Sequence, residues 1–108
     1  MTIAARGDLE LTVLLAIQRL DDDAYGLRIR REVGQLRQRD CAVGAIYTTL
    51  IRLEEKGLLS SHATEPLPQR GGRSRRVYRL TGDGKRALAQ ARRAATRLWN
   101  LEPLGGET

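Results

Sequence analysis

The residues best suited to chemistry are five arginines that fall within ten positions, from Arg70 to Arg79. No carboxylate occurs in the sequence between Glu65 and Asp83, so the stretch is uniformly cationic. Cationic side chains arranged in this way can lie along the phosphates of a nucleic acid. The adjacent Gly71 and Gly72 indicate that the arginines surround a turn. The pattern favours a polyanion as partner, and a solvated charge run is the alternative.

The run before this segment has the apolar spacing of a helix that could enter a DNA groove. At 100° per residue, one face collects Val43, Ile46, Leu50 and Leu53. The opposite face collects Ala45, Thr48, Thr49, Arg52, Glu55 and Lys56. Small residues there permit close approach, threonines can bond base edges or phosphates, and an arginine can read guanine. Taken alone, the same face is equally typical of an ordinary solvated helix.

The helix and the arginines are joined by a predicted β-hairpin. Gly57 ends the helix as a C-cap. One strand is predicted from Leu58 to Ala63 and the returning strand from Arg75 to Leu80, with the prolines and glycines between them at the tip. A helix followed by a basic hairpin is a winged helix-turn-helix, so we expect double-stranded DNA as partner. The predicted DNA contacts are Gly44, Ala45, Tyr47, Thr48, Thr49, Arg52, Arg70, Arg73, Arg75 and Arg76.

Two further helices are predicted upstream, and they must position the DNA-contacting helix. The first begins at Asp8 and is apolar nearly all round, because Leu11, Leu14 and Leu15 lie off its main apolar stripe. Its second face is covered either by the core or by a partner subunit. The second helix is amphipathic and carries arginines on its outer side. The aspartates at 21–23 are expected to end the first helix and cap the second.

A last helix is predicted from a Thr81 cap to about Leu101. Apolar residues repeat along it at spacings of three, four and three, which is the pattern of a coiled-coil seam. We expect this seam to pack against a partner subunit and the first helix. The predicted dimer interface consists of Leu11, Leu14, Leu15, Leu88, Ala91, Ala95 and Leu98.

These elements predict a single domain over residues 1–108, of the α+β class and mostly helical. It comprises a winged helix-turn-helix over 8–80, a C-terminal dimerisation helix over 81–101 and a flexible tail over 102–108. The net charge of +6 fits a polyanionic partner. The longest apolar run, Val13 to Ile17, is too short to span a membrane. The single cysteine and the absence of a signal-peptide pattern favour a cytoplasmic protein.

Three single residues have more than one possible role. Trp99 lies beside the seam, where two copies could stack on a flat apolar effector, although packing against the first helix is the favoured interpretation. Cys41 near the start of the third helix is either redox-sensitive or, more commonly, structural. His62 and Cys41 lack the ligand number of a zinc site, so neither a metal nor a cofactor is predicted. The sequence has no phosphate loop and a single histidine, which argues against an enzyme.

The order of these motifs resembles the PadR-type transcriptional regulators. The resemblance covers about residues 8–100 and is carried by Ala24-Tyr-Gly-Leu-Arg-Ile29, Gly44-Ala-Ile-Tyr-Thr-Thr-Leu-Ile-Arg-Leu-Glu-Glu-Lys-Gly-Leu-Leu59 and Gly71-Gly-Arg…Tyr78-Arg-Leu-Thr-Gly-Asp-Gly84. It implies a homodimeric winged-helix repressor that releases its operator when an effector binds. Larger members have an additional helical domain, so this chain resembles the short subgroup. The alternatives are a sequence-indifferent architectural DNA binder and a basic module that binds an acidic protein.

Overall fold

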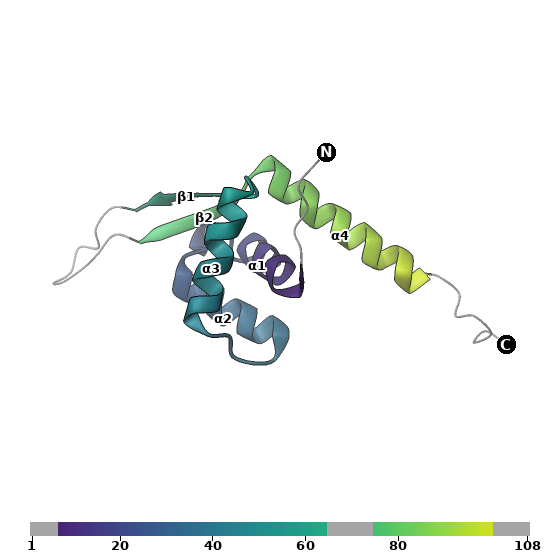
Figure 1. Cartoon of the computed structure of the whole chain (residues 1–108), viewed down its shortest axis with the longest axis horizontal. Coiled ribbons are helices and arrows are strands. Elements are labelled where there is room, and N and C mark those ends of the chain that lie inside the picture. The colour runs from purple at the N-terminus through teal and green to yellow at the C-terminus, as the bar shows by residue number, and fades with distance from the viewer. Residues whose placement is uncertain (1–6, 65–74, 101–108) are drawn as a thin grey trace.

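The computed structural model describes residues 7–64 and 75–100, which form four α-helices, a short 3-10 helix and a two-stranded sheet (Figure 1). Along the chain these are α1 (Gly7–Leu20), the 3-10 helix η1 (Asp21–Asp23), α2 (Gly26–Arg37), α3 (Val43–Glu55), β1 (Leu59–Ala63), β2 (Arg76–Leu80) and α4 (Gly82–Asn100). This arrangement confirms the predicted class, a mostly helical winged helix-turn-helix.

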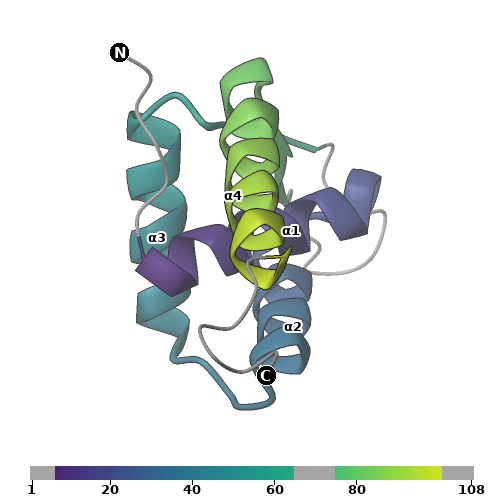
Figure 2. The same ribbon diagram turned by 90° about the vertical axis from the view of Figure 1, so that its right-hand side faces the viewer.

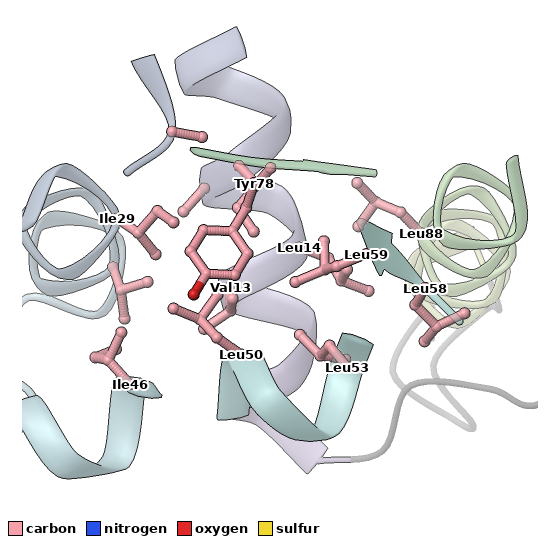
Figure 3. Close-up of a cluster of buried hydrophobic side chains, with 14 of the residues drawn as sticks. Val13, Leu14, Ile29, Ile46, Leu50, Leu53, Leu58, Leu59, Tyr78 and Leu88 are labelled. Carbon is pink, nitrogen blue, oxygen red and sulfur yellow. The ribbon is translucent and has the colours of Figure 1, made fainter. Parts of the chain in front are cut away.

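Helix α1 is the centre of the fold, because it contacts α2, α3, α4 and β2. Figure 3 shows its side chains Val13 and Leu14 between Ile29 of α2 on one side and Leu88 of α4 on the other, with Leu50 and Leu53 of α3 below them. Leu14 is completely buried inside this core, together with Val13 and Ile29. The prediction that Leu14 lies at a subunit interface is therefore wrong. The nearly uniform apolar surface of α1 is covered largely by its own chain.

Strand β2 is covered on both of its edges. It pairs antiparallel with β1, in a register that runs from Leu59 opposite Leu80 to Ala63 opposite Arg76. Its other edge meets the extended backbone before α2, where the Tyr78 N–H donates to the Ala24 carbonyl over 2.8 Å. Buried and exposed side chains do not simply alternate along β2, because the consecutive residues Val77 and Tyr78 are both buried.

The junction between α3 and the sheet is fixed by a glycine. Gly57 has a φ of +78°, and its N–H donates to the Glu54 carbonyl over 3.0 Å. The next N–H, of Leu58, reaches back to the Leu53 carbonyl over 2.9 Å. This pair of bonds is the Schellman motif that commonly ends a helix, and it confirms the predicted C-cap.

The start of α4 is held by Thr81, as predicted from the sequence. Its hydroxyl oxygen accepts from the Gly84 N–H at 3.0 Å and donates to the Gly57 carbonyl at 2.6 Å. The helix approaches the Leu58 carbonyl so closely that a Cβ on Gly84 would collide with it. The expected aspartate cap on α2 is wrong, because Tyr25 occupies the N-cap position and no side chain caps that helix.

Helix α4 is covered only along its first half. Figure 2 shows it lying across α1, and Figure 1 shows its C-terminal half running away from the other described helices. Ala87 and Leu88 are buried in the core cluster, so Leu88 belongs to the fold of one chain rather than to the predicted dimer interface. Leu98 and Trp99 are 71% and 87% exposed. The favoured interpretation of Trp99, packing against α1, is therefore wrong.

Candidate nucleic-acid interface

The outer face of α3 presents most of the side chains that the sequence assigned to DNA. Ala45, Thr48 and Arg52 are exposed, while Ile46, Leu50 and Leu53 point into the core. Gly44 also lies on this surface, and no atom outside its own helix lies within 4 Å of where its Cβ would be. A helix face with small side chains at its N-terminal end and polar side chains further along can approach a duplex groove closely.

Two residues of α3 differ in burial from the prediction. Thr49 is 5% exposed, and its hydroxyl donates to the Ala45 carbonyl one turn earlier over 2.8 Å. The helix backbone therefore satisfies the only polar group of this side chain, so Thr49 packs in the core and does not face DNA. Val43, predicted to be in the core, is 46% exposed because it starts the helix at the edge of the packed face.

Ile51 is the exposed residue that the sequence prediction omitted. Its side chain is 58% exposed on the outer face of α3, near Thr48 and Arg52. At 100° per residue it lies nearly opposite Leu53. The helical spacing therefore contained this signal, but an isoleucine surrounded by apolar neighbours in the sequence resembles a core residue.

The orientation of α3 relative to α1 is fixed by an ion pair. The Lys56 ammonium group lies 2.8 Å and 3.0 Å from the two carboxylate oxygens of Glu10. Both side chains are largely buried, so solvent screens the pair weakly. Lys56 therefore faces α1 rather than the outer side of α3, which corrects its predicted position. On the α2 side, the Arg30 Nε–H donates to the Cys41 carbonyl over 2.9 Å and ties α2 to the turn before α3.

The hairpin holds one arginine, just before β2 begins, against an aromatic ring. The Arg75 guanidinium carbon lies 4.1 Å from the centroid of the Tyr25 ring, which is a cation–π distance. The backbone of Arg75 is held as well, since its carbonyl accepts from the Thr64 N–H and its N–H donates to the Thr64 hydroxyl over 2.9 Å. Arg75 thus occupies a defined place at the end of the β1–β2 ladder away from Leu59 and Leu80, where Tyr25 contacts it.

A chain of side-chain hydrogen bonds joins the second arginine to α3. An N–H of Arg76 donates to the Ser61 hydroxyl over 2.9 Å, and that hydroxyl donates to a carboxylate oxygen of Glu54 over 2.8 Å. The three residues come from β2, β1 and α3, so the contact links both strands to the helix. The negative charge of Glu54 orients Arg76 through the serine.

Tyr25 and the two arginines meet at one shallow pocket between α2, α3 and β2. Its walls come from Tyr25, Gly26, Leu27, Tyr47, Arg75, Arg76 and Tyr78. Tyr47 is 45% exposed and lies so close to Gly26 that a side chain there would collide with its ring. The ring of Tyr47 is therefore packed against Gly26, and the rest of its surface stays open to a partner. Burial and the nearby charge of Glu54 raise the pKa of Tyr78 above its ordinary value, so its phenol stays neutral.

The remaining predicted contacts, Arg70 and Arg73, lie outside the described residues. So do the predicted glycine turn and the chain after Asn100. Within residues 7–64 and 75–100, no three His, Cys, Asp or Glu residues come together as a metal site would require. No helix in the same part of the chain is both long and apolar enough to cross a membrane.

Comparison with known proteins gives consistent matches along most of the chain. Residues 13–90 match the transcriptional regulator PadR-like family. The transcriptional regulator Rv3488 of Mycobacterium tuberculosis is 40% identical over 88 residues, which span 82% of this chain and 77% of the relative.

Two solved structures are similar in both sequence and fold. A PadR-like transcription factor from Bacteroides fragilis is 28% identical with a TM-score of 0.70, over 83% of this chain and 82% of that one. A PadR family regulator from Clostridium difficile R20291 is also 28% identical, with a TM-score of 0.64 over 87% and 96% of the two chains.

Proposed function

The chain belongs to the PadR-like family of transcriptional regulators, and from that premise we propose that it is a homodimeric repressor that binds operator DNA and is released by an effector. The operator is then an inverted repeat. Two copies of α3, one from each subunit, enter successive major grooves about 34 Å apart.

One observation carries the DNA-binding part of the proposal. Helix α3 and two arginines of the hairpin border the same pocket, through Tyr47 on one side and Arg75 and Arg76 on the other. A groove-sized helix beside fixed cations matches a duplex, in which a groove lies between rows of phosphates. In this arrangement the outer face of α3 selects sequence, and the hairpin supplies affinity.

The uncovered part of α4 supports the dimer. Ala91 is half-buried, Ala95 is exposed and Leu98 is 71% exposed, so the described residues of its own chain cover the predicted seam less towards its C-terminal end. Leu11 and Leu15 of α1 are also only partly covered. A second copy packed along this surface would bury the apolar side chains of both subunits.

The effector part of the proposal concerns Trp99. Its indole is 87% exposed near the end of α4, close to the seam that a second copy would cover. Two such rings near a two-fold axis could stack on a flat apolar molecule. Binding there would release DNA by changing the spacing of the two α3 helices, provided that the effector has unequal affinity for the two arrangements.

The test of the proposal compares two arginine variants on a selected duplex and a shuffled one. The duplex is obtained by selection from a random library, and binding is measured by fluorescence anisotropy across a salt series. Arg52→Ala is expected to lose the preference for the selected duplex. Arg75→Ala is expected to weaken binding to both duplexes alike. It should also reduce the slope of log affinity against log salt concentration by about one, the share of one phosphate contact. If the wild-type chain binds both duplexes equally, it is an architectural DNA binder and the proposal is wrong.

The dimer is tested separately by analytical ultracentrifugation of Leu98→Glu. A buried charge at the seam should shift the protein to monomer, because an unpaired carboxylate resists desolvation. A matched control, Gln90→Glu, adds the same charge at an exposed position of the same helix and should leave the dimer intact. A wild-type chain that sediments as a monomer at high concentration would contradict the dimer.

A further inference from the structure

Ile51 is an exposed apolar side chain at the centre of the outer face of α3. It follows Thr48 by three positions and Gly44 by seven, so the three residues form one line along the helix. It is 58% exposed, although it belongs to a residue type that is usually buried. As a β-branched side chain in a helix, Ile51 also has a nearly fixed χ1 angle.

The fold itself gives Ile51 no role. The core side of α3 is filled by Ile46, Leu50 and Leu53, each of which is completely buried. Water around an exposed apolar group is unfavourable, and the free energy falls when a partner covers that group. The surroundings of Ile51 define what that partner must offer.

Those surroundings are charged: Glu54 and Glu55 follow Ile51 by three and four positions on α3, and three arginines lie on or next to the same helix. Arg52 lies beside Ile51 on the same helix, and Arg75 and Arg76 border the pocket next to α3. Under the proposed function the partner is duplex DNA, so it must offer an apolar group between the phosphates that the arginines contact. The major groove of duplex DNA does this, because the thymine 5-methyl group projects into the groove between the two phosphate rows.

We propose that Ile51 contacts the 5-methyl group of a thymine in the major groove and so makes the chain prefer a T·A pair at that position. This inference rests on the proposed function and adds a base identity to it. Burying one methyl group is worth about 0.8 kcal/mol, which corresponds to roughly fourfold in affinity. Its stiff χ1 angle means that Ile51 loses little side-chain freedom on binding.

The test removes the methyl group from DNA without altering base pairing. The wild-type chain selects a duplex from a random library, and each thymine in that duplex is then replaced by deoxyuridine, one at a time. With the wild-type chain, we expect one position in each half-site where the replacement weakens binding about fourfold. With Ile51→Ala, the selected duplex should bind more weakly, and the same replacement should have no further effect.

Val43→Ala is the matched control, because Val43 is also a half-exposed β-branched residue of α3 but lies at the edge of its packed face. It should retain the deoxyuridine effect at the Ile51-dependent position. Thermal unfolding of each variant checks that the fold is intact, which is expected since neither side chain is in the core.

The outcomes separate the inference from its premise. If the wild-type chain enriches no sequence, the proposed function fails and the inference falls with it. If it enriches a sequence but every deoxyuridine duplex binds equally, only the thymine contact is wrong. If Ile51→Ala alters the oligomeric state in the absence of DNA, the side chain is covered by protein, which also overturns the inference.

Discussion

Arg75 is stacked on the ring of Tyr25, with 4.1 Å between the guanidinium carbon and the ring centroid. The contact joins the hairpin to the residue immediately before α2, which is far away in the sequence. An arginine on an aromatic face retains its N–H donors at the edge of the guanidinium plane. Tyr25 therefore limits where Arg75 can point and leaves its donors available to a phosphate.

Replacing Tyr25 by leucine should weaken duplex binding. The variant keeps apolar bulk but loses the π face, so Arg75 must be ordered when DNA binds. A cation–π contact at an exposed site is worth roughly 0.5–1 kcal/mol, which predicts about a two- to fivefold loss of affinity. Tyr25→Phe should bind like the wild type in the same anisotropy titration. Unchanged binding by Tyr25→Leu would mean that the ring does not hold Arg75 for DNA.

Thr48→Val and Thr49→Val should have different effects on DNA affinity. Thr48 is exposed on the outer face of α3, so losing its hydroxyl should weaken binding to the selected duplex roughly two- to tenfold. The Thr49 hydroxyl is bonded to the Ala45 carbonyl and is buried, so Thr49→Val should leave DNA affinity unchanged. Equal losses in the two variants would show that Thr49 also contacts DNA.

Gly84→Ala should destabilise the protein. The added Cβ would press against the Leu58 carbonyl, which is backbone and cannot turn aside. Overpacking of this kind costs about 1–3 kcal/mol in the free energy of unfolding, measurable by urea denaturation. The control is Gly44→Ala, where the new Cβ meets nothing within 4 Å and helix propensity favours alanine. A Gly84→Ala protein as stable as the wild type would show that α4 can move away from Leu58.

Alkaline pH should destabilise the protein partly through Tyr78. Burial and the charge of Glu54 raise its pKa in the folded state above the ordinary value of 10.0. The unfolded chain therefore loses the phenol proton first, and the stabilisation present below pH 10 is lost as pH rises towards the folded pKa. In this window Tyr78 contributes a slope of up to about 1.4 kcal/mol per pH unit. Urea denaturation at several pH values should give a shallower decline for Tyr78→Phe, and equal declines would contradict the assignment.

Features set by short stretches of sequence were predictable. The Gly57 helix end and the Thr81 cap depend on neighbouring backbone groups, so residue type and spacing identified both. The general apolar faces of the helices followed from periodicity in the same way. The α2 cap failed because an aspartate near a helix start need not adopt the cap geometry.

Features that depend on which surface covers a residue were not predictable. Leu14 and Leu88 have the spacing of an interface whether their own chain or a second chain covers them, and the structure assigns both to the core. Thr49 was placed outside because threonine is polar, although a helical carbonyl can satisfy it internally. Ile51 was missed for the converse reason, since an apolar residue is assumed to be packed.

The half of α4 that leaves the body of the protein has a quantitative consequence if a second copy covers it. While most of the protein is monomeric, the concentration of dimer grows with the square of the total protein concentration. The occupancy of a two-fold symmetric DNA site then grows in the same way. A halved supply of protein would then free the site far more than proportionally. The uncovered Leu98 and Trp99 would thus make regulation depend on the number of chains more steeply than binding by a single chain would.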